Sequence, residues 1–166
     1  MFNKFIAAIL PYFPKKFIWL FSHTYISGET IEDAMRVSKD LNSQDMVVTI
    51  DVLGEFIKTL DETEANKKEY LNLIDIAESN GVKGSFSVKP TSFGLLIDKE
   101  ICYQHIREIV LKAASYNRFV RVDMEDSPCT SMEIELFRKL KTEFPANVGL
   151  VLQAYLKRTL DDIKSM

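Results

Sequence analysis

The stretch "GSFSVKPTSFGL", residues 84–95, joins a short apolar run to a lysine and then to a proline. Phe86 and Val88 alternate with serines, which is typical of a strand. Pro90 has no backbone N–H to give to a neighbouring strand, so the strand is predicted to end at Lys89. A cation therefore lies at the end of a strand that we predict to be buried.

Three other segments have the same design, an apolar run followed by a polar residue. The four runs are MVVTI (46–50), SFSV (85–88), FVRV (119–122) and VGLVL (148–152). Apolar residues at helical spacing separate them, as at Tyr70, Ile74 and Ala77. The runs begin roughly 30 to 40 residues apart, which is the length of a βα unit and predicts parallel strands.

Parallel strands need helices to cover them, so the alternation predicts an α/β fold. A chain of 166 residues is most simply one domain, and its 46% hydrophobic content suits a packed core. We divide the chain into an N-terminal helical preface, residues 1–26, and a βα region, residues 27–166.

The preface is aromatic and basic, and the first acidic residue of the chain is Glu29. Its apolar run is interrupted by Pro11 and Pro14, well short of the ~20 residues that a spanning helix needs. Two interpretations stay open. The preface packs on the domain, or it contacts a membrane surface through its lysines and aromatic side chains.

Composition and motifs exclude several classes of function. A net charge of −3 argues against a nucleic-acid partner. Cys102 and Cys129 form no CxxC pair and suit a reducing cytosol, so we expect a cytoplasmic protein with free thiols. His23 and His105 are isolated and are predicted to be structural. The glycine-rich phosphate motifs and the GxSxG motif are absent.

The polar residues Asp51, Lys89, Asp123 and Gln153 come directly after the four runs. The carboxyl ends of parallel strands face the ligand site, so we expect these side chains to converge. A carboxylate partner or an anion would then offset the desolvation of Lys89. The alternative is that they are loop residues facing water.

The acidic residues near these strand ends raise a metal alternative. Asp51, Asp123 and Glu125 could bind a hard cation through their oxygens, as in a metal-assisted aldolase-like barrel. Lys89 would compete for the same charge, so we predict no metal. Met124 either packs or lies against a flat aromatic ligand.

Five segments together resemble one family. They are SGETIEDAM (27–35), VTIDVLGE (48–55), SVKPTSFGL (87–95), RVDMEDS (121–127) and VLQAYLKRT (151–159). In this order they resemble the monofunctional bacterial type of FAD-dependent proline dehydrogenase. The resemblance implies a TIM-type (βα)8 barrel preceded by N-terminal helices. About four of the eight strands are present, and residues 27–166 correspond to its N-terminal half.

The resemblance also implies a site. Lys89 would pair with the carboxylate of L-proline, and Asp123 would be the active-site aspartate beneath substrate and flavin. Met124 and Gln153 would contact the isoalloxazine ring of FAD, which carries the redox chemistry. The product would be 1-pyrroline-5-carboxylate. Electrons would pass to a membrane quinone, which links the preface to the inner membrane surface.

Half a barrel holds at most half of such a site. We expect the chain alone to bind FAD poorly, to oxidise little proline, and to self-associate through its open strand edges. Two classes of function remain: part of an enzyme that needs its C-terminal half, or a non-catalytic half-barrel remnant or assembly module that needs a partner chain.

Overall fold

A single parallel sheet of four strands organises the protein. The computed structural model describes residue 14 and residues 26–54 and 57–166. The strands are β1 (Val48–Asp51), β2 (Gly84–Val88), β3 (Val120–Val122) and β4 (Val148–Leu150). They lie in the order β1-β2-β3-β4, and every neighbouring pair is parallel. The predicted α/β class with parallel βα units is confirmed.

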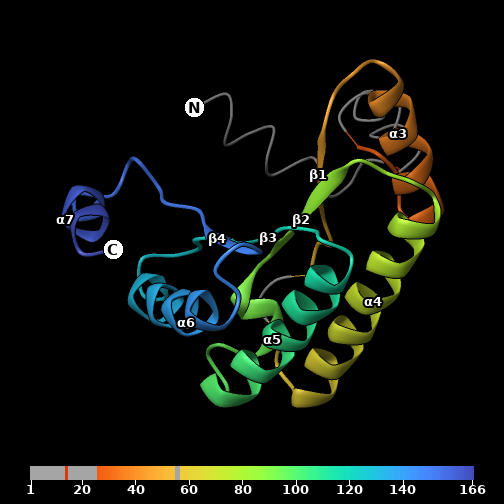
Figure 1. Cartoon of the computed structure of the whole chain (residues 1–166). Helices are drawn as coiled ribbons and strands as arrows, with labels where there is room; N and C mark the ends of the chain where they lie inside the picture. Colours follow the sequence, from red (N-terminus) through yellow and green to blue (C-terminus); the bar gives the residue numbers. More distant parts are fainter. Residues whose placement is uncertain (1–13, 15–25, 55–56) are drawn as a thin grey trace. The chain divides into compact units, whose positions relative to one another are not determined.

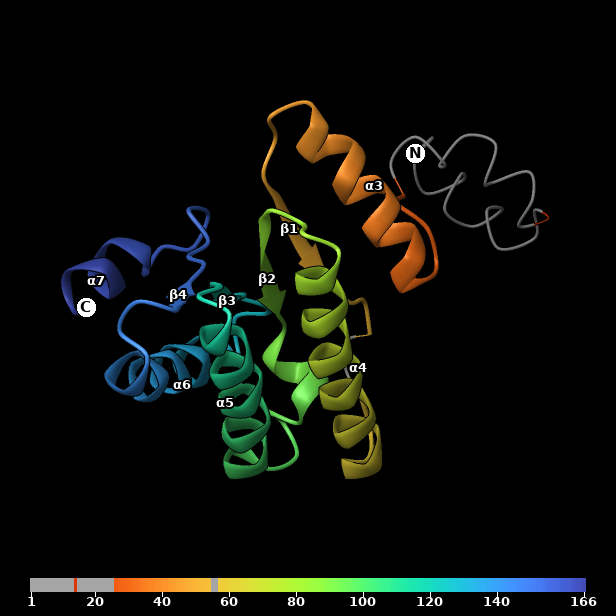
Figure 2. The ribbon, with the colours of Figure 1, turned by 45° about the vertical axis from the view of Figure 1, so that its right-hand side comes forward.

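Helices occupy each connection between the strands and also flank the sheet. Those between strands are α4 (Leu60–Ser79), the short 3-10 helix η2 (Pro90–Phe93), α5 (Lys99–Ser115) and α6 (Thr130–Glu143), while α3 (Ile31–Ser43) precedes β1 and α7 (Thr159–Lys164) follows β4. Figures 1 and 2 show α4 and α5 side by side, and α6 packs against β4. This is the arrangement that parallel strands require, since each crossover places a helix on the sheet.

Three of the predicted runs form shorter strands than expected, and the run 119–122 loses only Phe119. The run 46–50 begins as β1 only at Val48, whose partner Gly84 is the first residue of β2. The run 148–152 ends as β4 at Leu150, whose partner Val122 is the last residue of β3. The start of β1 and the end of β4 are therefore set by the residues available for pairing on the neighbouring strand.

Local sequence signals explain where the long helices begin. The hydroxyl of Thr59 accepts the N–H of Glu62 at the start of α4. The carboxylate of Asp98 accepts two N–H groups at the start of α5. Such caps satisfy backbone donors that have no partner inside the helix.

The core lies between the central strands and their helices. Its fully buried members are Phe86, Val88, Val120 and Val122 from the strands and Leu73, Ile74, Ile106, Ile109 and Leu140 from the helices. Each such side chain contributes on the order of 1.5–3 kcal/mol by leaving water.

The side chains that alternate with this core form a polar row on the sheet. The Arg121 guanidinium donates to the hydroxyls of Thr49 and Ser85 at 2.8 and 2.9 Å. Those hydroxyls lie 3.0 Å apart. Successive strand residues point to opposite faces, so one face is apolar and the other is polar.

The chain divides into two compact units, Met1–Val37 and Ser38–Met166. The expected helical preface, residues 1–26, lies almost entirely outside the described residues, and so does its expected membrane contact. Among the helices that are described, none is long and apolar enough to cross a membrane.

Candidate functional site

Three charged side chains meet at the carboxyl ends of β1, β2 and β3. The ammonium of Lys89, the residue after β2, binds the carboxylate of Asp51 at the end of β1. The same ammonium lies 3.9 Å from Oδ2 of Asp123, the residue after β3. The structure thus brings together three of the four polar residues that follow the predicted runs.

Partial burial strengthens this charged cluster. The Lys89 side chain is 19% exposed, and the side chains of Asp51 and Asp123 are each 25% exposed. Charges at this depth are screened less by solvent and salt than surface charges are. For these three residues the alternative of loop charges facing water is wrong.

The sheet places all three on its polar face. Asp51 is the register partner of Ser87, and Ser87 is the partner of Arg121. Lys89 and Asp123 each follow two residues later on the same strands, so alternation gives them the same face. The N–H of Asp123 extends the strand pairing by donating to the Val88 carbonyl at 2.9 Å.

Hydroxyl groups fix both carboxylates. Ser87 Oγ donates to Asp123 Oδ1 at 2.5 Å. The Tyr70 hydroxyl, from α4, lies 3.1 Å from Asp51 Oδ1 and 2.7 Å from the Ser87 carbonyl, and it accepts the Val52 N–H at 3.1 Å. Burial and the neighbouring carboxylates raise the pKa of Tyr70, so the phenol keeps its proton.

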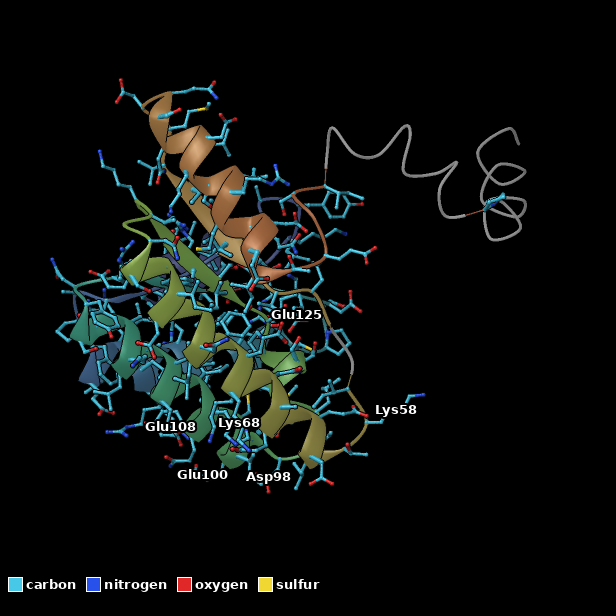
Figure 3. The ribbon with its side chains drawn as sticks, turned by 90° about the vertical axis from the view of Figure 1, so that its right-hand side faces the viewer. Lys58, Lys68, Asp98, Glu100, Glu108 and Glu125 are labelled. Carbon is cyan, nitrogen blue, oxygen red and sulfur yellow. The ribbon has the colours of Figure 1, made fainter. Side chains whose placement is uncertain are left out.

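A further acidic pair lies beside this cluster. Glu125 accepts two hydrogen bonds from Thr91, and its own N–H donates to Glu133 on α6. Figure 3 shows Glu125 apart from the charged side chains labelled on α4 and α5, such as Lys68 and Glu108. Glu125 is therefore bound within the loops next to the site.

Gln153 lies three residues after the end of β4 and not directly at the strand end, because β4 stops at Leu150. The side-chain amide of Gln153 donates to the main-chain carbonyl of Met124 at 2.8 Å. The main-chain carbonyl of Gln153 accepts the Thr159 hydroxyl at 2.5 Å. Gln153 therefore joins the loop after β4 to the loop that carries Asp123.

The side chain of Met124 is buried, as the packing alternative expects. Tyr155, in contrast, is 95% exposed. The two side chains thus differ in how much of their surface a ligand could reach.

The metal alternative finds no support in the described ranges. They contain no cluster of three or more His, Cys, Asp or Glu side chains arranged to hold a metal ion. Asp51 and Asp123 share an ammonium, and Glu125 binds Thr91. His105 Nε2 lies 3.3 Å from Glu64 on the outer helices, which fits a structural histidine.

Sequence reasoning missed four residues that hold the site: Tyr70, Ser87, Thr91 and Glu133. Tyr70 and Glu133 lie at helical spacing among core positions. A polar side chain at such a position was the signal in the sequence that could have identified them. Ser87 and Thr91 lie on either side of Lys89, in the stretch that marked the strand end.

Comparisons with known proteins identify similar chains. The family model described as proline dehydrogenase matches residues 34–166. Proline dehydrogenase 1 of Bacillus subtilis subsp. natto is 34% identical over 142 residues, which are 86% of this chain and 47% of that protein. Proline dehydrogenase of Deinococcus radiodurans is 33% identical over 153 residues, 90% of this chain and 49% of that protein.

The chain thus spans about half the length of the curated relatives it matches. Among solved structures, proline utilization A from Bdellovibrio bacteriovorus, inactivated by N-propargylglycine, matches with a TM-score of 0.81 at 24% identity. The match covers 91% of this chain and 19% of that one, and it supports the fold.

Proposed function

Because the chain belongs to the proline dehydrogenase family, we propose that it takes part in the FAD-dependent oxidation of L-proline to 1-pyrroline-5-carboxylate. The observation that carries the proposal is the position of Lys89 between two carboxylates at the ends of three parallel strands. In folds of this kind the carboxyl ends of the strands form the ligand site.

In this proposal Lys89 binds the carboxylate of proline, and Asp123 lies near its cationic secondary amine. The cluster provides one cation and two anions, which complements a ligand that carries both charges. Tyr70 and Ser87 already hold the two aspartates in place, so little reorganisation is needed when the substrate binds. An ion pair on the carboxylate also orients the ring carbons for oxidation.

Two residues beside the charged cluster, Met124 and Gln153, would hold the flavin ring of FAD. The Gln153 side-chain amide donates to the Met124 carbonyl, so the two residues that would contact the ring are held together next to Asp123. Because the Met124 side chain is buried, its contact with the ring would come from its main chain. FAD, when bound, would supply the electron acceptor for the reaction.

We further propose that activity needs residues beyond the four strands, in the same polypeptide or in a second chain. The relatives are about twice as long as the matched segment, and the residues for the remaining contacts with FAD would come from that length. The quinone acceptor follows from the resemblance alone. The cytoplasmic location rests on the two free cysteines, and the membrane contact rests on the basic and aromatic composition of the preface. The non-catalytic half-barrel is the competing function.

Spectroscopy with matched variants tests the proposal. The purified protein, mixed with the C-terminal half of a relative where needed, should carry a flavin absorption band that proline bleaches. Lys89→Met should raise the KM for proline by at least tenfold, because the carboxylate loses its only assigned cation. Lys68→Met, an exposed lysine, is the control and should change nothing. A flavin-free mixture with no response to proline would instead favour the non-catalytic half-barrel.

A further inference from the structure

A second set of contacts joins the two loops that carry the charged cluster. Thr91 donates its N–H and its hydroxyl to the two carboxylate oxygens of Glu125, at 2.8 and 2.5 Å. Thr91 lies two residues after Lys89, and Glu125 lies two residues after Asp123. We call this Thr91–Glu125 contact the loop clip, because it holds together the segments that carry the lysine and the aspartate.

Helix α6 adds a further contact to the loop clip through the side chain of Glu133. Oε1 of Glu133 accepts the N–H of Glu125 at 3.1 Å. Glu133 is 0% exposed, and within the described part of the chain its Oε2 has no hydrogen-bond partner. A buried carboxyl with one oxygen unsatisfied lowers stability, so packing alone is a poor reason for an acid at this position.

We propose that Glu133 is a positioning residue which, by holding the backbone of Glu125, fixes the distance between the lysine and the aspartate of the site. Where it concerns proline, this inference rests on the proposed function, whereas the loop clip itself does not. In the proposed function, Lys89 and Asp123 bind the two charged groups of the substrate both before and during the reaction. A clip this close to them is therefore placed to govern the KM.

The charge of Glu133 affects how well it holds the clip. Burial raises the pKa of Glu133 to about 7, and nearby acidic groups add to the shift. The groups that face it are the carboxylates of Asp123, Glu125 and Asp126 and the thiols of Cys102 and Cys129. Both thiols have raised pKa values and stay neutral near pH 7. Below pH 7 Glu133 is therefore neutral, and above it a buried negative charge repels Glu125.

Two substitutions at one position separate positioning from packing. Glu133→Gln keeps an acceptor for the Glu125 N–H and carries no charge. Glu133→Leu removes the acceptor and fills a similar volume. Deuterium exchange of the Glu125 amide in the purified protein should be about tenfold faster in Glu133→Leu and unchanged in Glu133→Gln at pH 6. This measurement does not depend on the reaction.

Kinetics give the second readout. Glu133→Leu should raise the KM for proline about tenfold with a smaller change in kcat. In the natural protein we expect the KM to rise above pH 7, where Glu133 becomes charged. Glu133→Gln carries no charge and should abolish that rise. If Glu133→Leu does not fold, Thr91→Val replaces it, with a several-fold rise in KM expected. The kinetics use the mixture with the C-terminal half of a relative described above. If that mixture does not oxidise proline, the proposed function fails and amide exchange alone decides. The positioning role is overturned if exchange at Glu125 is the same in every variant, or if the melting temperature falls while KM is unchanged.

Discussion

Lys89 and Asp51 form an ion pair across two neighbouring strands, at the point where both strands end. Asp123 lies 3.9 Å from the same ammonium, so one cation serves two carboxylates and the group is negative overall. Such a group favours a ligand that brings a positive charge together with its carboxylate, as an amino acid does. The ion pair therefore anchors Lys89 and, in the proposed function, would also bear on which ligands Lys89 binds.

Asp51→Asn should increase the affinity for simple anions. The substitution removes a negative charge that competes for Lys89, and at this depth such a charge is worth on the order of 1 kcal/mol or more after screening. Acetate should then inhibit proline oxidation several-fold more strongly. The control is Asp61→Asn, at an exposed position in the first turn of α4. Equal inhibition constants in both variants would show that Asp51 does not compete with the ligand.

Tyr70→Phe should destabilise the protein without disturbing its core. The ring would still pack edge-on against Phe93, at 5.4 Å between centroids. The lost hydroxyl leaves the Val52 N–H and the Ser87 carbonyl without that partner, at a cost of about 1–3 kcal/mol. Urea unfolding measures this cost. Tyr103→Phe, whose hydroxyl lies 3.5 Å from Glu143, should cost less than about 0.5 kcal/mol, and a similar loss in both variants would contradict the assignment.

The sheet and most of its charged cluster could be predicted because both follow from spacing. Parallel strands follow from the distance between apolar runs, and the meeting of Asp51, Lys89 and Asp123 follows from the common edge of such strands. Gln153 was harder to place. Its position depends on where the pairing of β4 with β3 ends, which is at Leu150 and Val122. The end of this pairing depends on both strands and cannot be read from the sequence of one segment.

The residues that hold the charged cluster in place could not be predicted from the positions of the strand ends, because some of them lie on helices. Glu133 lies on α6 at helical spacing from the buried Leu136 and Leu140, so the sequence places an acid on an apolar helix face. That conflict between residue type and position was a signal for a special role. The partner it binds, the Glu125 backbone, depends on tertiary packing and is visible only in the structure.

Arg118→Lys should lower stability and leave the site intact. The guanidinium donates to Glu78 at 2.6 and 3.0 Å and also to the Val82 carbonyl, near the amino end of β2 and far along the strand from Lys89. A lysine cannot reproduce these forked contacts, so we expect a loss of about 1–3 kcal/mol in thermal or urea unfolding. Arg107→Lys, which also pairs with a glutamate but is more exposed, should cost less than about 1 kcal/mol. A changed KM for proline in Arg118→Lys would contradict this division between the two ends of the strands.

Glu133 should make stability fall as the pH rises. Its pKa is about 7 in the folded protein against an ordinary value of 4.5, so the folded state binds the proton more tightly than the unfolded state does. The stabilising effect of that proton is complete below pH 4.5 and is lost as the pH rises to 7, and it amounts to about 3 kcal/mol. Other groups titrate over the same range, so the measured quantity is the difference in free energy of unfolding between Glu133→Gln and the natural protein. This difference should shift in favour of the variant from pH 4.5 to 7 and then level off. A difference that stays constant across this range would mean that the pKa of Glu133 is the same in the folded and the unfolded protein, and that its burial is compensated by contacts other than those described.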